Sequence, residues 1–278
     1  MESKNKDTNF LEKSLSEQFI KIFNELGIEK NDNIFITGNF SHFAKIKLKK
    51  NRKLDIFYNT LRSQIGKNGS IFCPTASMNI CNTSTPFDLH KTCSHEMGAL
   101  SEFIRKKDYS VRSFHPFWSV TGVGKSSNFL RNVGRGAYGA GSPWEIMLDL
   151  DFKQITFGVH PSKAVTLIHH IETVFGAPYR FIKEFNHPVY RNGTLRSEFF
   201  YQTVSYKDSN IVKKDLLNEH YFEELMKRNQ FHEITDNIGM KYYSFKFANF
   251  YDVAIDFFKK DIYNYLEFPP KVKPYQEL

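Results

Sequence analysis

The chain is poor in cysteine and has no long apolar run. Its three cysteines, Cys73, Cys81 and Cys93, form no C-x-x-C pair, so neither a disulfide framework nor a cysteine-based zinc site is expected. No stretch approaches the roughly 18 apolar residues of a membrane-spanning helix, and the chain starts with polar and charged residues rather than a signal sequence. These absences favour a reduced, cytoplasmic protein without a membrane span.

Acidic residues are also fewer than basic ones. The chain has 38 Lys and Arg against 30 Asp and Glu, which gives a formal net charge of +8. Such a balance is typical of proteins that bind nucleic acid, a membrane surface or a polyanionic small molecule. The basic residues are scattered, however, and the densest run, residues 45–53, resembles a loop and helix start. Because the sequence holds no zinc finger, RNP motif or basic heptad, we expect no nucleic-acid partner.

The apolar residues that are present suffice for a sizeable core, at 41% hydrophobic and 16% aromatic. Their patterns predict strands at 33–38, 69–75, 153–159, 198–206 and 241–247. They predict helices at 10–26, 54–65, 96–106, 163–175, 215–229 and 250–266. Strands that alternate with helices indicate an α/β fold, a layered sheet flanked by helices. Without repeats or a linker, residues 1–278 are expected to form a single domain.

The helix expected at 163–175 can be capped by Ser162 and ended by Gly176. No zinc site is expected in or near it. The motif H-E-x-x-H is absent, and Cys93-Ser94-His95 lacks partners at ligand spacing.

Two histidines and a glutamate interrupt the apolar pattern of this helix, in TLIHHIETVFG. His169 and Glu172 are three residues apart, so they lie on one side of the helix, whereas His170 points elsewhere. A histidine that titrates near neutral pH beside a carboxylate suits general-base catalysis. The spacing alone leaves a second interpretation open, in which both groups merely hydrogen-bond within the fold.

Four motifs follow one another along the middle of the chain. They are Met97-Gly98 through Arg105, Arg112-Ser113 with His115-Pro116 and Ser119, Gly139 with Ser142-Pro143, and Ile168-His169 with Glu172. In this order and spacing they resemble the aminoglycoside 3-N-acetyltransferase family, the antibiotic N-acetyltransferase fold that is unrelated to the GNAT acetyltransferases. The helix–strand pattern at both ends extends the resemblance to nearly the whole chain. The resemblance implies transfer of an acetyl group from acetyl-CoA, or of another short acyl group, to an amine, without a metal and without a covalent enzyme intermediate.

At the matching positions the resemblance implies that His169 is the general base and Glu172 its carboxylate partner. Elementary chemistry agrees, because a protonated amine has no lone pair and its attack on a thioester needs a base to take its proton. A nearby carboxylate favours the imidazolium that forms. His170 is expected to be structural.

The stretch RSFHPFWS has two interpretations. Arg112 and the hydroxyls of Ser113 and Ser119 could bind the phosphates of CoA. Alternatively, His115-Pro116 could fix a turn at the cleft wall while Arg112 pairs with an acid.

The end of the first strand departs from the family. Where relatives have a V-H-x-S-L-like sequence before a loop that contacts CoA, this chain has ITGNF, so backbone contacts at Thr37 and Gly38 are expected there. Thr75, at the end of the second strand, completes the set of residues expected at the cofactor. On the substrate side we expect Asp88, which matches an acidic family position, together with His115 and Tyr138.

The net charge bears on which amine is acylated. Aminoglycosides carry several positive charges and need an acidic cleft, whereas a surface of net charge +8 attracts a polyanion. We therefore expect an amino sugar linked to a nucleotide diphosphate, of the kind used to make bacterial surface polysaccharides. The alternatives are an aminoglycoside resistance enzyme and a non-catalytic basic binding protein, and the intact His169 and Glu172 speak against the latter. The sugar, the acyl group and homodimer formation are left open.

Overall fold

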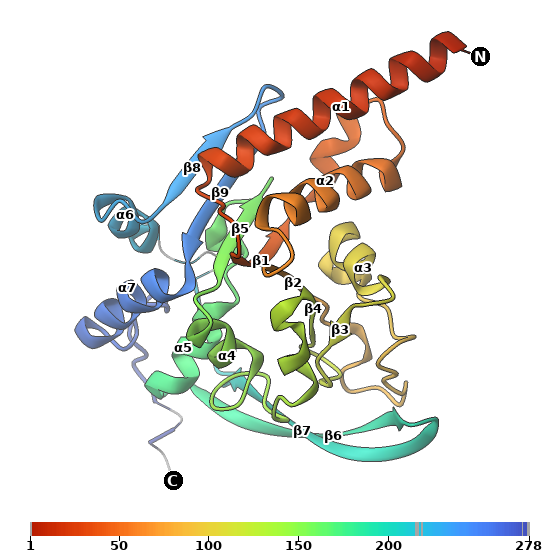
Figure 1. The fold of residues 1–278 in the computed structure, drawn as a ribbon. Helices are drawn as coiled ribbons and strands as arrows, with labels where there is room; N and C mark the ends of the chain where they lie inside the picture. The colour runs from red at the N-terminus through yellow and green to blue at the C-terminus, as the bar shows by residue number, and fades with distance from the viewer. Residues whose placement is uncertain (1, 215–216, 218, 274, 277–278) are drawn as a thin grey trace.

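A computed structural model describes residues 2–214, 217, 219–273 and 275–276 (Figure 1). Its centre is a seven-stranded sheet of order β3-β4-β2-β1-β5-β9-β8. The strands are β1 (Asn33–Gly38), β2 (Ser70–Pro74), β3 (Val111–Arg112), β4 (Val120–Gly124), β5 (Lys153–Phe157), β8 (His232–Thr235) and β9 (Lys241–Lys246). The central strand β1 is parallel to β2 and β5, so the three carboxyl ends meet at one edge. The outer strands pair antiparallel.

Helices cover both faces of this sheet, as Figure 1 shows. One face carries α1 (Glu2–Glu25), α2 (Lys50–Ile65) and α3 (Ala99–Arg105). The other carries α4 (Pro143–Asp149), α5 (Leu167–Phe175), α6 (His220–Lys227) and α7 (Phe247–Lys260). No helix in the described part of the chain combines the length and the apolar character needed to cross a membrane. The expected α/β fold, a layered sheet flanked by helices, is confirmed.

The alternation of side chains along β1 explains the two cores. Successive strand residues point to opposite faces of a sheet. Ile34 and Ile36 are accordingly buried in the cluster with α1 and α2. Phe35 faces the other way, and its ring contacts the rings of Trp144 and Phe247 at centroid distances of 5.0 and 5.7 Å.

A long hairpin forms a second sheet of two strands. Strand β6 (Arg180–Arg191) pairs antiparallel with β7 (Thr194–Ser205) along its whole length. The turn residues Asn192 and Gly193 both have positive φ, which suits the tight connection between twisted strands. The predicted strand at 198–206 is therefore confirmed, but its partner β6 was not predicted.

Three helix predictions need correction at their ends. The helix expected from residue 163 begins at Leu167, and Ser162 is not its cap. Ser162 lies instead in the 3₁₀ turn Pro161–Lys163, where the imidazole of His160 accepts a hydrogen bond from its backbone N–H. The turn uses the residues that the sequence pattern had assigned to the helix start.

The later helices are shorter than predicted. Of the helix expected over 215–229, the structure shows α6 at His220–Lys227, and residues 215, 216 and 218 lie outside the described residues. The last helix ends at Lys260 rather than near 266, because Asp261 adopts an extended conformation. The chain beyond it is then free to fold back toward α5.

Candidate active site

The candidate site is centred on the first turn of α5. The helix brings His169 and Glu172 side by side, with His169 Nδ1 at 2.8 Å from Glu172 Oε2. Because an ionised carboxylate can only accept hydrogen bonds, Nδ1 carries the proton and Nε2 keeps its lone pair. The His169 side chain is 26% exposed and Glu172 is fully buried. The pair therefore leaves one basic ring nitrogen without a partner among the described residues.

Arg180, the first residue of β6, completes this pair. Its Nη2 lies 2.7 Å from Glu172 Oε2 and 3.0 Å from His169 Nδ1. His169 Nδ1 carries a proton that it donates to Glu172, so it cannot accept a hydrogen bond from Arg180. The guanidinium therefore donates to the carboxylate. A buried carboxylate without a counter-charge would be strongly destabilising, and Arg180 supplies that charge. Sequence reasoning missed Arg180, although the need of a buried glutamate for a cation was a usable signal.

These contacts set the protonation states of the pair. Burial lowers the pKa of His169 below its ordinary value, Glu172 opposes this by raising it, and Arg180 and Lys213 lower it further. Burial alone would raise the pKa of Glu172, but His169 and Arg180 outweigh it and hold that pKa below its usual range. At neutral pH the imidazole is therefore neutral and the carboxylate is ionised. These are the states that a general base and its partner require.

Two tyrosine rings flank His169. The ring centroid of Tyr138 lies 5.7 Å from that of His169, and that of Tyr265 lies 6.4 Å away. Tyr138 is one of the residues expected at the substrate, and the structure does bring it to the base. Its hydroxyl is buried without a partner among the described residues, and burial raises its pKa, so the hydroxyl stays protonated.

His170 points away from the pair, as expected. Its Nδ1 accepts a hydrogen bond from Gly139 N at 3.2 Å and lies 3.5 Å from Ser142 Oγ. Burial lowers the pKa of His170 to about 4, so the ring is a neutral acceptor. His170 thus fixes the glycine-rich loop that carries Tyr138.

Arg112 is buried among neutral acceptors. Its guanidinium donates to Thr75 O at 2.6 Å and to Ser119 Oγ at 2.8 Å, and Ser119 Oγ in turn donates to Thr75 O. Ser113 Oγ accepts from a backbone N–H of β4. Arg112 forms no ion pair within the described residues, so the pairing with an acid that the second interpretation included is not found there. The geometry favours a structural network over phosphate binding for Arg112, Ser113, Ser119 and Thr75.

Two residues expected at the substrate are also engaged within the chain. His115 accepts backbone N–H bonds from its own turn through Nδ1, and its Nε2 lies 3.3 Å from Tyr201 O on β7. It therefore fixes a turn, which was the second interpretation of this stretch. Asp88 Oδ1 accepts two backbone N–H bonds within its own turn. Neither side chain hydrogen-bonds to His169 or Glu172.

A groove of about 550 Å³ opens where β1 ends. Its walls are Gly38, Asn39, Phe40, Ser41, Ala44, Lys50, Lys53, Glu96, Met97, Gly98 and Ala99. Gly38 has to be glycine, because a Cβ there would lie 2.5 Å from the carbonyl oxygen of Phe157. Gly38, one of the residues expected at the cofactor, lines this groove.

Gln154, on β5, connects this groove with α5. Its amide nitrogen lies 3.2 Å from Thr37 Oγ1, at the end of β1, and 3.2 Å from the carbonyl oxygen of Ala164, which precedes α5. Thr37 thus supports the groove from behind rather than lining it. The link holds the end of β1 and the helix of His169 in a fixed relation.

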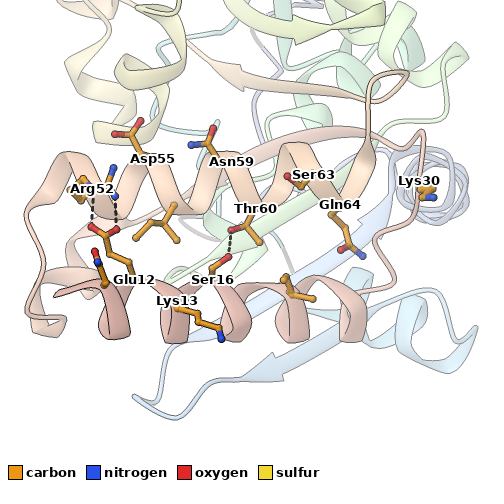
Figure 2. A pocket seen from close by; sticks show the side chains of 13 residues that line it. Glu12, Lys13, Ser16, Lys30, Arg52, Asp55, Asn59, Thr60, Ser63 and Gln64 are labelled. Atoms are coloured by element: carbon orange, nitrogen blue, oxygen red, sulfur yellow. Dashed lines mark hydrogen bonds and ion pairs between the residues drawn. The ribbon is translucent and has the colours of Figure 1, made fainter. Parts of the chain in front are cut away.

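The largest cavity lies elsewhere, between α1 and α2, with a volume of about 770 Å³ (Figure 2). Its polar side chains pair across the two helices, Arg52 with Glu12 and Ser16 with Thr60. Its walls contain no histidine or cysteine. It offers no base for acyl transfer, so size does not identify the site here. Within the described residues, no group of three His, Cys, Asp or Glu side chains is arranged to hold a metal ion.

The chain is similar to known proteins both in sequence pattern and in fold. The family model for aminoglycoside 3-N-acetyltransferase matches residues 39–259. The solved aminoglycoside acetyltransferase AAC(3)-Xa is 16% identical with a TM-score of 0.75, over 93% of this chain and 99% of that chain. AAC-IIIb, in a binary complex with CoASH, is 18% identical with a TM-score of 0.74, over 93% and 98%. AAC-VIa bound to sisomicin is 18% identical with a TM-score of 0.72, over 88% and 97%. No match was found among curated proteins.

Proposed function

The chain belongs to the aminoglycoside 3-N-acetyltransferase family, and on that premise we propose that it acetylates the amino group of a nucleotide-linked amino sugar with His169 as general base. Its family makes it an acetyl-CoA-dependent N-acyltransferase. The observation that carries the proposal is the hydrogen bond between His169 Nδ1 and Glu172 Oε2, which leaves Nε2 free. Such sugars are building blocks of bacterial surface polysaccharides.

The proposed reaction is a direct transfer. The neutral amine attacks the thioester carbonyl of acetyl-CoA, and as the C–N bond forms, His169 Nε2 takes a proton from the amine nitrogen. The imidazolium is stabilised by Glu172, whose charge lies next to Nδ1. The tetrahedral intermediate then collapses, the C–S bond breaks, and the proton passes to the departing sulfur. The products are an amide and CoA with a free thiol.

The groove at the end of β1 suits the co-substrate. Lys50 provides an exposed ammonium group for phosphates, and the turn after Gly38 lets a ligand approach the backbone. The ammonium group of Lys53 is buried and donates to the carbonyls of Phe43 and Ile46, so it adds positive charge without being free.

A second hollow of about 420 Å³ shares Lys50 and Ala99 with this groove. Lys106 and Lys107 line it together with their ion-pair partners Glu102 and Asp55. The two hollows together fit a long, negatively charged molecule such as CoA. The CoASH bound to AAC-IIIb supports an acyl-CoA co-substrate.

Charge supports an anionic acceptor. The carboxylate that contacts His169 is already paired with Arg180, so it does not offer free negative charge to a polycation. A nucleotide diphosphate, by contrast, is attracted by the net charge of +8. The Asp88 carboxylate, which matches an acidic family position, is engaged in its own turn.

The second candidate is acetylation of an aminoglycoside antibiotic. The observation in its favour is the sisomicin bound to AAC-VIa, a protein of the same fold. The two candidates share the base, the co-substrate and the chemistry, and they differ in the charge of the acceptor.

A substrate screen separates the candidates. Release of CoA from acetyl-CoA would be followed with a thiol reagent, with nucleotide-linked amino sugars and with sisomicin or kanamycin as acceptors. We expect the largest kcat/KM for a nucleotide-linked sugar, and a lower value when the nucleotide is trimmed away, because its binding energy is lost. A larger kcat/KM for an aminoglycoside than for every nucleotide sugar would overturn the proposal. Absence of amine-dependent CoA release would instead favour a binding protein.

A further inference from the structure

The chain after α7 folds back onto the candidate active site. Figure 1 shows it descending past α5 toward the C-terminus. Tyr265, in this segment, places its ring 6.4 Å from the ring of His169. The Tyr265 carbonyl accepts a hydrogen bond from Lys214 N, and Lys213 forms an antiparallel bridge with Leu266. These backbone contacts fix Lys213 beside the segment that reaches the base.

The proposed reaction does not involve the ammonium group of Lys213. Its side chain is exposed, and it forms no ion pair and no side-chain hydrogen bond with the described residues. The neighbouring Lys214 differs, because its Nζ donates to the carbonyl of Asn264 at 3.0 Å. Among the described residues Lys213 is therefore a cation without a partner, whereas the side chain of Lys214 is hydrogen-bonded within the fold.

Lys213 lies within electrostatic reach of the catalytic pair. Although its side chain is exposed, partial desolvation by the surrounding chain lowers the pKa of Lys213, Arg180 lowers it further, and Glu172 raises it. Lys213 in turn contributes to the lowering of the pKa of His169. Since Arg180 already pairs with Glu172, Lys213 adds a further positive charge next to the segment that carries Tyr265. An anion bound there would relieve the repulsion between the two cations.

The Tyr265 segment lies outside the part of the chain that the family model matches, which ends at residue 259. Acetyl transfer is common to the family, so features for the thioester and its base are expected within the matched part. Residues beyond the matched part that lie next to His169 are better candidates for recognising an acceptor that is particular to this chain.

We propose that Lys213 and Tyr265 form an acceptor subsite, in which the Lys213 ammonium binds a phosphate group of the amine-bearing substrate and the Tyr265 ring packs against its sugar. The proposal rests on the proposed function, because it takes His169 as the base and a nucleotide-linked amino sugar as the acceptor. A lysine is a compact point charge that suits a phosphate. A cationic group at the same place on an aminoglycoside would be repelled.

Binding measured by calorimetry on the CoA-loaded enzyme tests the subsite without turnover. The probes are glucosamine 1-phosphate and glucosamine, which differ by one phosphate group. We expect the wild type to bind the phosphorylated sugar about tenfold more tightly. Lys213→Gln should lose this preference, Lys213→Arg should keep most of it, and Lys207→Gln, which changes an exposed lysine shortly after β7, should keep all of it. Unchanged CoA affinity and melting temperature show that Lys213→Gln is folded.

Equal affinity of the wild type for the two sugars, or a preference that persists in Lys213→Gln, would overturn the subsite. The variant His169→Ala keeps this result separate from the proposed function. If it loses turnover but retains the phosphate preference, both proposals stand. If it turns over normally while the preference still depends on Lys213, the base assignment fails and the subsite remains.

Discussion

Arg180 Nη2 lies 2.7 Å from Glu172 Oε2, the same oxygen that accepts the hydrogen bond from His169 Nδ1. The carboxylate thus stays ionised in a fully buried position, where it interacts with both the imidazole N–H and a guanidinium. Burial lowers the pKa of His169 below its ordinary value, Glu172 raises it, and Arg180 lowers it again, so the ring is not locked as an imidazolium. The arrangement supplies a base that is unprotonated at neutral pH and a partner that stabilises it once it is protonated.

Replacing Arg180 with Gln should raise the pKa of His169, because Arg180 lowers it in the wild type. His169 acts when neutral, so the rate falls as pH drops through this pKa. The acid limb of the kcat/KM profile should therefore move to higher pH in Arg180→Gln and stay near its wild-type position in Arg180→Lys. Arg180→Gln should also unfold more easily, by about 3–5 kcal/mol, because Glu172 is left as an unpaired buried charge. A limb that stays in place or moves to lower pH would contradict the account.

Replacing Glu172 with Gln should shift the profile in the opposite direction. Glu172 raises the pKa of His169, so its loss should move the acid limb to lower pH. Turnover above the limb should also fall by about 10- to 1000-fold, because the imidazolium loses its partner and the ring its fixed tautomer. The pH profiles of this variant and of Arg180→Gln, measured side by side, form a matched pair. Shifts of the same sign in both would refute the charge balance.

Loss of His170 should affect the fold more than the chemistry. His170→Ala leaves the buried Gly139 N–H without its acceptor, which should cost about 1–3 kcal/mol in urea unfolding. Turnover per folded molecule should stay within about fivefold of the wild type. His170→Asn, which retains an acceptor, should recover part of the stability. A loss of turnover as large as that of His169→Ala would show that the wrong histidine has been assigned.

Replacing Lys50 with Gln should weaken CoA binding, since Lys50 lines both hollows of the groove. We expect the Kd for CoA to rise about 3- to 10-fold at low salt, and the difference from the wild type to shrink at high salt. Lys67→Gln, which changes an exposed lysine outside the groove, serves as the control. Calorimetry at two ionic strengths gives both numbers. Equal effects of the two variants on the Kd for CoA would show that CoA does not bind in this groove.

The features that could be predicted from the sequence are those that neighbouring residues determine. His169 and Glu172 meet because a helix places residues three apart together, whatever surrounds it. The central strands at 33–38, 69–75 and 153–159 are short apolar runs bounded by turn residues, and they appear within about two residues of their predicted ends.

The features that could not be predicted depend on how separate elements of the fold pack against one another. Arg180 reaches Glu172 only because β6 starts beside α5. Lys213 lies beside the segment after α7 through its bridge with Leu266, which is far from it in the sequence. The sequence also left two interpretations open for Arg112, and only the packing of distant loops shows that it hydrogen-bonds to neutral oxygens within the fold. The hairpin strand β6 escaped notice because its polar and charged residues give it no continuous apolar run.

The most direct test of the central claim is the turnover of His169→Ala with acetyl-CoA and the best acceptor from the substrate screen. If His169 is the general base, kcat should fall by about two to four orders of magnitude, with CoA affinity and melting temperature close to those of the wild type. Retention of near-normal kcat in this variant would remove His169 from the mechanism and contradict the account.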